Sequence, residues 1–505
     1  MPPAVRPAPA FTSAPVATVT RLGALALALA AAAGWCGCCL AARPPTLAGP
    51  TAAWSRATRG RRALRAAGPG RGSSDDSVRS FWDLLGARPT WESRKIDVCR
   101  LPGRGRGWVA TSTIAKGDLL LAVPWEAAVV APLGDSSEAE LALELLRAVG
   151  EAAPATSSGS QLQPGLWKEY ADTVFPEPPC GAGFWSEELL EQLEWPPAVG
   201  EAMAYSEQLR GAAEWVAQTA GVPLSRAAWA VGVVVSRSFT VGDSERALLP
   251  LADIFNHHPQ SPAAWAAAHE ADPEHPYTAW SRSEDGAWFE VRAMRPVEVG
   301  EEVTISYGEE SNAEILAVHG FLPEDNEADY LELFATSEEL LVAVEAITGR
   351  QQLAGRLARL EAAEAADAPL AVRPGGLAAA DHLLGSLEAA LCTDEEFAAL
   401  IEPWSDAAGH PVLAPSSSLP PERRRALRSE AVQVASVVAA GALASMIPAD
   451  KDDEGLSLAA AAAAEDSTSG GEGVEAWQLA VRYRLGVKRL LSDFLEWAKE
   501  AQGRT

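Results

Sequence analysis

Cysteine is scarce in this 505-residue chain, and the positions of its six cysteines exclude a disulfide framework. Three of them lie between residues 36 and 39, whereas Cys99, Cys180 and Cys392 are far apart. A small disulfide-stapled fold needs an even set of cysteines at regular spacing. Outside the cluster at residues 36–39, no CxxC pair is present to bind zinc. We therefore expect free thiols and no structural metal.

Basic residues are also too few for a nucleic-acid-binding protein. The chain has 41 Lys and Arg against 68 Asp and Glu, which gives a formal net charge of −27. Binding to phosphates requires clustered cations, so nucleic acid is excluded as the main partner. An acidic surface suits a basic protein or peptide partner, although solubility alone is the more common reason for such a charge.

Acidic residues are absent before Asp75, and the same segment contains nine arginines. Within it, Leu22 to Ala42 is apolar, and a basic stretch rich in Arg, Ser and Ala follows. We interpret residues 1–74 as a cleaved two-part targeting leader, a signal-like segment and then a transit-like segment. Leaders of this kind resemble those of algae whose plastids lie behind extra membranes, which predicts a plastid protein located in the stroma. The alternative is a membrane anchor through residues 22–42.

The rest of the chain alternates between strand-like and helical sequence patterns. Short strands interrupted by glycine turns are expected from residue 96 to 130, a helical stretch from about 136 to 238, and strands again from 248 to 307. From about 331 to the end the pattern is helical, and Thr393 with Glu396 forms a capping-box sequence. We expect residues 414–424 and about 449–473 to be unstructured, because they are rich in polar residues, proline or glycine.

Two familiar sites can be rejected from spacing. His269 and His275 lie six residues apart with Pro273 between them, so they cannot form the H-E-x-x-H face of a zinc peptidase helix. The run "GRGRGW", which begins at Gly103, lacks the G-x-G-x-x-G spacing of a dinucleotide-binding loop.

Three other segments form a recognisable set. They are, in order, "GRGRGWVATSTIAKGDLLLAVP", "LLPLADIFNHHP" and "GEEVTISYGEESNAEILAVHGFLPEDN". Together they resemble the SET-domain methyltransferases, in particular the subgroup typified by the plastid Rubisco large-subunit lysine methyltransferase. The resemblance implies an α+β fold: a SET domain over about 80–330 with short sheets and a knot-like core, a helical insert, and an all-α substrate-binding domain over 331–505.

The resemblance also implies a binding site for S-adenosylmethionine as methyl donor. Asp253 and Asn256 with its neighbour His257 end an apolar run, where a bound donor would satisfy polar groups that a dry core could not. Asp253 is expected to support the pocket, and glycines beside two arginines to let the backbone approach the donor. The residues with implied cofactor-binding roles are Arg104, Arg106, Arg237, Asp253, Asn256, His257 and Phe321. His258 and His319 depart from the pattern of the family.

Tyr307 matches the catalytic tyrosine of the family. Lysine with a pKa near ~10.4 is almost wholly protonated at neutral pH and has no lone pair for attack. A narrow dry channel and the positive charge of the donor both lower that pKa, and the transfer is then mainly a matter of alignment. The reaction needs no metal.

The sequence thus predicts a protein-lysine methyltransferase whose partner is a protein with a target lysine. Histone-directed SET enzymes often carry a Cys-rich zinc segment after the catalytic tyrosine, and its absence here favours a non-histone substrate. Rubisco large subunit and aldolase are the candidates. We expect a monomer without stable membrane insertion after removal of the leader. The alternatives are a catalytically silent SET-fold module that binds proteins, and a protein-histidine methyltransferase.

Overall fold

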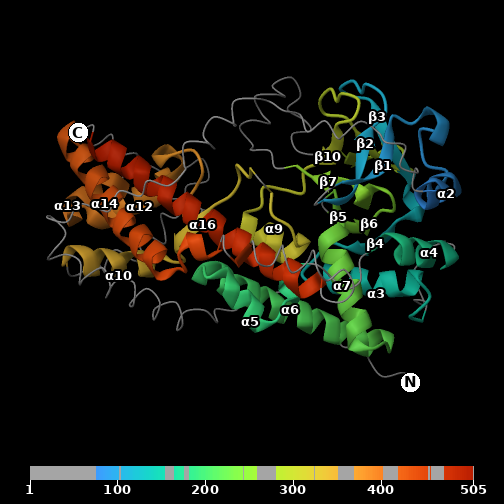
Figure 1. Ribbon diagram of the computed structural model, residues 1–505, viewed down its shortest axis with the longest axis horizontal. Coiled ribbons are helices and arrows are strands. Elements are labelled where there is room, and N and C mark those ends of the chain that lie inside the picture. Colours follow the sequence, from blue (N-terminus) through green and yellow to red (C-terminus); the bar gives the residue numbers. More distant parts are fainter. Residues whose placement is uncertain are drawn as a thin grey trace.

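The protein has a strand-rich lobe and a helical lobe, joined by a layer of long helices (Figure 1). The computed structural model describes residues 76–101, 104–153, 164–175, 181–242, 244–258, 280–323, 325–350, 369–401, 419–452, 455–456 and 471–503. The leader expected over residues 1–74 lies outside the described residues, as do His269 and His275.

The strands of the first lobe are short, and they form three small sheets. They are β1 (Ile96–Leu101), β2 (Gly105–Ala110), β3 (Leu119–Pro124), β4 (Val129–Pro132), β5 (Phe239–Val241), β6 (Glu245–Leu248), β7 (Asn256–His257), β8 (Trp280–Arg282), β9 (Trp288–Arg292) and β10 (Glu302–Ile305). The sheet orders are β1-β2-β10-β7, β3-β9-β8 and β4-β6-β5. β7 and β10 run parallel, so this sheet brings together three segments far apart in the sequence.

Helices fill the expected insert between β4 and β5. They are α3 (Ser137–Ala148), α4 (Pro164–Val174), α5 (Glu187–Leu190), α6 (Pro196–Ala220) and α7 (Leu224–Arg237). α6 ends at Gly221, whose φ of 72° suits glycine, and the chain turns by 120° into α7. The insert over about 136–238 is therefore helical, as predicted. A further helix, α2 (Asp76–Leu85), precedes β1.

The second lobe is mainly helical. Its helices are α10 (Ser337–Thr348), α12 (Asp381–Leu391), α13 (Asp394–Ile401), α14 (Pro421–Ser445) and α16 (Gly471–Gly503). The expectation of an all-α domain is wrong in one respect, because β11 (Leu331–Phe334) pairs antiparallel with β12 (Leu370–Val372). Both strands are short apolar segments that bury their side chains, a pattern that does not separate strand from helix. The capping box of Thr393 and Glu396 at the start of α13 is confirmed by two reciprocal hydrogen bonds of 2.8 and 3.2 Å.

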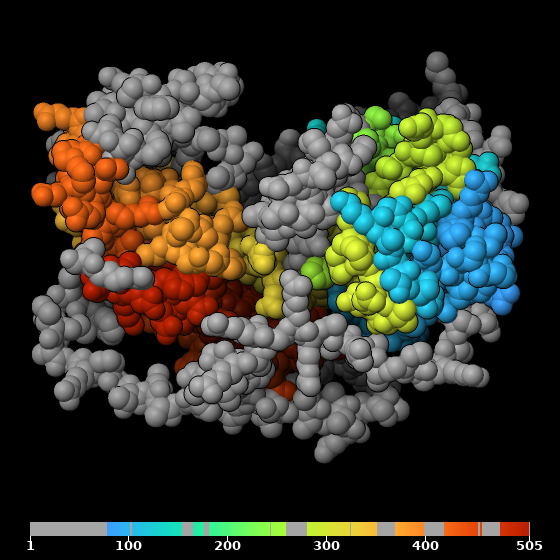
Figure 2. All heavy atoms as spheres, turned by 90° about the horizontal axis from the view of Figure 1, so that it is seen from above, coloured from blue at the N-terminus to red at the C-terminus, as the bar shows by residue number. Residues whose placement is uncertain are grey.

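Each lobe has its own hydrophobic core. In the first, the indole of Trp82 packs edge-to-face against those of Trp91 and Trp108, with ring centroids 5.7 Å apart in both pairs. The second core is built from leucines, alanines and valines of α10, α12, α14 and α16, with Phe334, Phe397 and Phe494. Helices of the insert contribute to both cores, since Leu209 belongs to the first and Leu193 to the second. In Figure 2 the blue and cyan strands and the orange and red helices accordingly occupy opposite ends of the molecule.

A buried ionic network ties α16 to the insert. The carboxylate of Asp452, with 0% of its side chain exposed, accepts hydrogen bonds from Arg484 Nε at 2.9 Å and Nη2 at 2.6 Å, and pairs with Lys488. Arg484 also donates to the carbonyl of Gln192 at 2.9 Å and lies 3.5 Å from Glu194.

This network corrects the disorder expected over about 449–473. Residues 449–452 form a helical turn, and residues 471–473 begin α16, while 457–470 lie outside the described residues. Acidic composition indicated a solvated segment, but cations from α16 neutralise Asp452 in the interior. Likewise, Pro421 to Arg424 of the other stretch form the first turn of α14, where a proline at N1 favours helix formation.

In the part of the chain that the structure describes, α14 is long and apolar enough to cross a membrane, and the bent pair of α6 and α7 passes the same test together. α14 buries Leu427, Ala431 and Val438 in the second core. It is therefore placed as a core helix. The alternative anchor at residues 22–42 lies outside the described residues.

Candidate functional site

The predicted site lies where β7 meets β10. Asn256 and His257 pair in parallel with Thr304 and Ile305, and the backbone N–H of His258 continues the ladder to the carbonyl of Ile305 at 2.9 Å. Tyr307 follows β10 by two residues. The pairing therefore places the second and third of the three segments that resemble SET-domain methyltransferases side by side, as the resemblance implied.

The sequence suggested that the apolar run before Asn256 is a strand, but the structure shows that it is not. After β6 the chain forms a 3-10 turn at Ala252–Ile254, and Leu251 just before it has a φ of 71°. This left-handed backbone is costly for a branched side chain. Two buried hydrogen bonds hold it: Leu251 N–H donates to the hydroxyl of Tyr170 at 2.7 Å, and Trp108 Nε1 donates to the carbonyl of Leu251 at 3.1 Å.

Asp253 is buried in this turn and is the centre of a polar group of three. Its carboxylate accepts a hydrogen bond from the hydroxyl of Tyr170, and Arg237 Nη1 lies 3.3 Å from its Oδ2. Arg237 also donates to the carbonyl of Asp253 at 3.0 Å. Burial raises the pKa of Asp253, while Arg237 and Tyr170 oppose that shift. Arg237 thus orders the turn that carries the site.

Asn256 is oriented by two acceptors. Its Nδ2 donates to Glu302 Oε1 at 2.7 Å and to the carbonyl of Arg106 at 3.1 Å. Gly107 makes this possible, because a Cβ atom there would lie 2.6 Å from Asn256 Nδ2 and 2.9 Å from Glu302 Oε1. The need for glycine at this position is therefore steric.

The two arginines of the glycine turn act through their side chains. Arg104 forms a 2.7 Å ion pair with Glu302 and donates to the carbonyl of His257 at 2.7 Å. Arg106 donates to the carbonyl of Thr173 in α4 at 2.7 Å. Between them, Gly105 has a φ of 70° and open space where a Cβ would stand. The backbone face that the resemblance assigns to the donor is thus accessible at Gly105.

Four rings gather around the end of β7. The ring of Tyr307 lies 5.1 Å from His257, 4.7 Å from His319 and 6.5 Å from Phe321, measured between centroids. The hydroxyl of Tyr307 donates to the carbonyl of Phe255 at 2.8 Å, and its backbone N–H donates to His257 Nδ1 at 3.0 Å. His257 Nδ1 is therefore an acceptor, and the ring is neutral there.

Burial controls the protonation of two of these rings. It lowers the pKa of His257 to about 4, and His319 adds to that effect. It raises the pKa of Tyr307 to about 12, against the opposing effect of Arg237. At neutral pH the site therefore presents an uncharged imidazole and a protonated phenol.

All eight residues singled out from the sequence converge on this region, and the structure adds others. Tyr170 was overlooked although it lies in the segment "LWKEYADTVF", because a tyrosine in an amphipathic helix is usually a core residue. Glu302 looked like an ordinary turn residue before a strand. Neither has a local signal, since each is defined by a partner more than 40 residues away.

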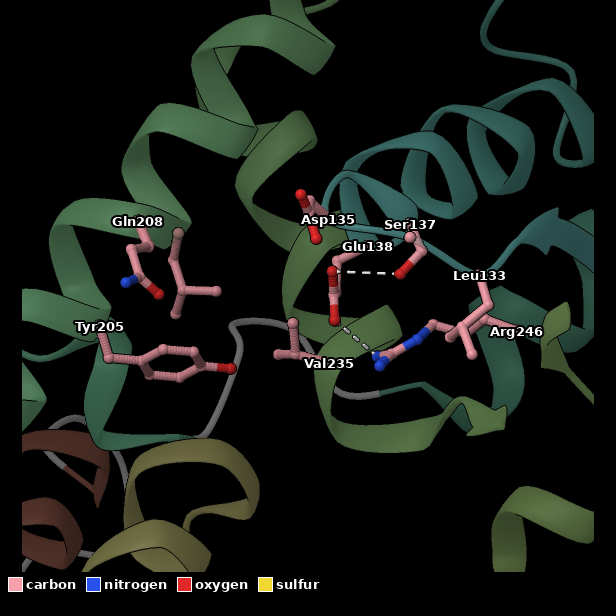
Figure 3. A pocket seen from close by; sticks show the side chains of 10 residues that line it. Leu133, Asp135, Ser137, Glu138, Tyr205, Gln208, Val235 and Arg246 are labelled. Atoms are coloured by element: carbon pink, nitrogen blue, oxygen red, sulfur yellow. Dashed lines mark hydrogen bonds and ion pairs between the residues drawn. The ribbon is translucent and has the colours of Figure 1, made fainter. Parts of the chain in front are cut away.

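Two cavities lie along α6, away from these eight residues. Figure 3 shows the first, of about 320 Å³, with Tyr205 on one side and the ion pair of Arg246 and Glu138 on the other. The second, of about 390 Å³, lies between α6, α16 and α9 (Asn312–His319), and Tyr205 lines it too. The predicted site is thus distinct from both.

The region fits the groups of S-adenosylmethionine. The open backbone at Gly105 offers polar main-chain groups, and Phe321 offers a ring face for a purine, while the guanidinium of Arg104 is paired with Glu302. In the part of the chain that the structure describes, no group of three or more His, Cys, Asp or Glu residues could hold a metal.

Comparison with known proteins finds one matching family model and several similar folds. Residues 105–308, which run from the glycine turn to one residue past Tyr307, match the model of the SET domain. This part of the chain is therefore similar to the SET domain. Two solved structures of the SET domain of LSMT are similar over 85% of this chain and 92% of their own: one bound to methyllysine and AdoHcy (TM-score 0.52, 18% identity), the other to lysine and AdoHcy (TM-score 0.51, 18% identity). No curated protein matches the chain. The expected SET fold with its helical lobe is confirmed.

Proposed function

We propose that this SET-domain protein is a protein-lysine N-methyltransferase that uses S-adenosylmethionine. One observation carries the proposal: the hydroxyl of Tyr307 is fixed at 2.8 Å from the carbonyl of Phe255, the residue directly before the Asn256–His257 pair. The phenol of Tyr307 is thus held next to the Asn256–His257 pair that the proposal assigns to the donor. The lysine and methyllysine bound in the two similar solved structures support the choice of acceptor.

Different residues of the site would bind the donor and orient the acceptor amine. The donor supplies a methyl group on a positively charged sulfur. Asn256, Arg104 and Phe321 would hold the donor, and the backbone at Gly105 would contact it. Tyr307 remains protonated at neutral pH, so its hydroxyl can orient the acceptor amine by hydrogen bonding without adding a charge. Alignment of nitrogen, carbon and sulfur is then the main source of rate.

The substrate we propose is a non-histone protein of the plastid, with Rubisco large subunit and aldolase as candidates. The basic, acid-free segment before Asp75 supports plastid import. The net charge of −27 suits a basic segment around the target lysine. A reporter fused to residues 1–74 should enter plastids, and a fusion that stayed in the cytosol would refute the location.

The function is tested by binding and labelling in sequence. Calorimetry should detect binding of the donor and of its demethylated product. Methyl-tritiated donor should then label a band in a plastid extract or purified Rubisco or aldolase. Tyr307→Phe should bind the donor normally but transfer about a hundredfold more slowly, since it lacks one positioned hydrogen-bonding group.

Mass spectrometry of the labelled band separates the remaining alternatives. A methylated lysine supports the proposal, and a methylated histidine would assign the protein to the histidine methyltransferases. If the wild type binds the donor but labels nothing, a docking role without catalysis is favoured. A folded sample with no affinity for donor or product would end the proposal.

A further inference from the structure

A polar cavity beside the proposed site has no role in the proposed function so far. It measures about 320 Å³, which is the size of a small ligand pocket. Its walls come from the start of α3 with the turn before it, from α6, from the end of α7 and from β6. The helical insert therefore supplies most of the cavity, and Tyr307 lies outside it.

Two polar side chains of α6 face this cavity. Among the described residues, none forms a hydrogen bond with the hydroxyl of Tyr205 or with the side-chain amide of Gln208. Figure 3 shows the phenol of Tyr205 pointing across the cavity. Gly183 sets the place of this ring, because a Cβ atom at Gly183 would lie 2.9 Å from Tyr205 Cδ1. The cavity thus offers a ring in a fixed position, together with a hydroxyl and an amide that a ligand can engage.

The charged groups of the cavity are unequal in number. Asp135 lies exposed in the turn before α3, and no described residue pairs with its carboxylate. Glu138 forms a 2.9 Å ion pair with Arg246, and each of these two side chains is 22% exposed. The lining therefore carries two carboxylates and one guanidinium, which already has its counter-ion. An entering anion would have to compete with Glu138 for Arg246, whereas an entering cation finds Asp135 available.

The surroundings of Tyr205 agree with this charge. Burial raises the pKa of its hydroxyl, and the carboxylates of Glu138 and of Glu310 add to the rise, against the opposing effect of Arg246. Negative charge that disfavours a phenolate favours a cation at the same place. A planar guanidinium can also stack on an aromatic ring while it donates hydrogen bonds to carboxylates, which an ammonium does less well. Arginine is therefore the side chain that the cavity fits best.

The end of α7 connects the cavity to the proposed site. Val235 lines the cavity, and the carbonyl of the next residue, Ser236, lies 3.2 Å from His319 Nδ1. The ring centroid of His319 lies 4.7 Å from that of Tyr307. These contacts place the cavity wall on the order of 10 Å from the phenol, a distance that an extended chain covers in about three residues. A substrate chain that presents a lysine to Tyr307 can therefore reach the cavity with a nearby side chain.

We infer that this cavity, the flanking subsite, binds an arginine of the protein substrate about two to four residues from the target lysine. Its role rests on the proposed lysine methylation, to which it adds a selected substrate sequence. Asp135 and Glu138 pair with the guanidinium, which stacks on the ring of Tyr205. The amide oxygen of Gln208 accepts one further hydrogen bond. No bond is made or broken there, because the subsite only holds the chain while the target lysine reaches Tyr307.

The test is methyl transfer from tritiated donor to a library of peptides with one fixed central lysine. At each of the four positions on either side, the library carries Arg, Lys, Gln or Glu in turn, on a neutral background. The wild-type full chain is compared with Asp135→Lys and Tyr205→Leu. Glu214→Lys is the matched control, because Glu214 is exposed on α6 and lines neither cavity. Calorimetry with the demethylated product of the donor shows that each variant is folded.

At one position, the wild type should prefer Arg over Glu by about tenfold, the effect of one hydrogen bond to a charged group. Asp135→Lys should abolish or invert this preference at that position and leave the other positions unchanged, because an ammonium replaces a carboxylate. Tyr205→Leu should remove the preference for Arg over Lys, because stacking favours the guanidinium. Glu214→Lys should keep the wild-type preference, which separates the flanking subsite from a general effect of net charge.

The outcomes distinguish failure of the flanking subsite from failure of the proposed function. If the library is labelled but shows no charge preference, or if Asp135→Lys keeps the preference, the subsite is wrong and methylation stands. A preference for Glu that Arg246→Gln abolishes would overturn the choice of a cation. If a plastid extract is labelled but the library is not, the substrate is not recognised through a linear segment, and the subsite is wrong as well. If neither is labelled, the proposed function fails, and the subsite with it.

Discussion

The two lobes each bury an aspartate, and the two are used differently. Asp452 lies in the interface of the helical lobe with the insert, where Arg484 and Lys488, 4% and 7% exposed, surround its carboxylate. Asp253 lies in the strand-rich lobe with one cation, Arg237, whose side chain is 26% exposed. Its other partner is the neutral hydroxyl of Tyr170.

The difference shows how structural and functional polar groups can be told apart. Around Asp452, protein cations supply the neutralising charge, so the network is complete without a ligand. Around Asp253, the same turn continues into Asn256 and His257, next to the open backbone of Gly105. The first centre fixes how the lobes are joined, and the second orders a surface that we assign to the methyl donor.

The largest effect is expected from Asp452→Ala. Removal of the carboxylate leaves Arg484 and Lys488 buried with Glu194, 3.5 and 4.0 Å away, as their remaining counter-ion, which should cost about 3–5 kcal/mol of unfolding free energy. Urea unfolding would measure it, with Asp450→Ala as control, since Asp450 is exposed two residues away. Protein that remains folded should bind the donor normally. A loss below about 1 kcal/mol would mean that the network contributes little to holding the lobes together.

Acidification should weaken the strand-rich lobe through His257. Its folded pKa of about 4 lies below the ordinary value of 6.5, so the unfolded chain binds more protons between these values. This contribution is complete above pH 6.5 and is lost as the pH falls toward 4, by at most about 3 kcal/mol.

The measurement is urea unfolding at pH 7 and pH 4.5 for wild type and His257→Asn, because carboxylates also titrate in this range. The variant should lose less stability than the wild type between the two pH values. Equal losses in both proteins would show that His257 does not couple pH to stability.

Gly107→Ala should damage the site without removing any polar group. The new Cβ would meet Asn256 Nδ2 at 2.6 Å, and overpacking of this kind costs about 1–3 kcal/mol. We expect donor affinity to fall about tenfold, as seen by calorimetry, because the amide of Asn256 must move. Gly134→Ala is the control, since a Cβ at Gly134 meets no atom within 4 Å. Unchanged affinity would contradict the role given to Asn256.

Sequence reasoning reached the site because its residues lie in short segments with recognisable spacing. Asn256, His257 and Tyr307 could be named, and the structure brings them together through the parallel pairing of β7 with β10. Sequence reasoning could not identify Glu302 or Tyr170, because their roles depend on which segments become neighbours in space.

The wrong predictions also arise because partners distant in the chain determine the structure. Leu249 to Phe255 resembled a strand because it is apolar, but Leu251 donates a hydrogen bond to Tyr170 and accepts one from Trp108, and these bonds stabilise a turn with a left-handed Leu251. Asp452 lay in a segment whose composition predicted disorder, and only the packing of α16 explains its burial. Periodicity describes local preference, and both exceptions are set by partners distant in the chain.

The smallest effect is expected from removing a capping box, and both the helical lobe and the candidate site contain one. Thr393 begins α13 in the helical lobe, and Ser311 begins α9, which ends at His319. Thr393→Ala and Ser311→Ala should each cost about 1 kcal/mol of unfolding free energy, because each removes one helix cap. Methyl transfer should fall only in Ser311→Ala, since fraying of α9 would loosen His319 against Tyr307. If both variants kept full activity at equal stability loss, α9 would be a structural helix like α13, and the position of His319 beside the phenol would not depend on how its helix begins.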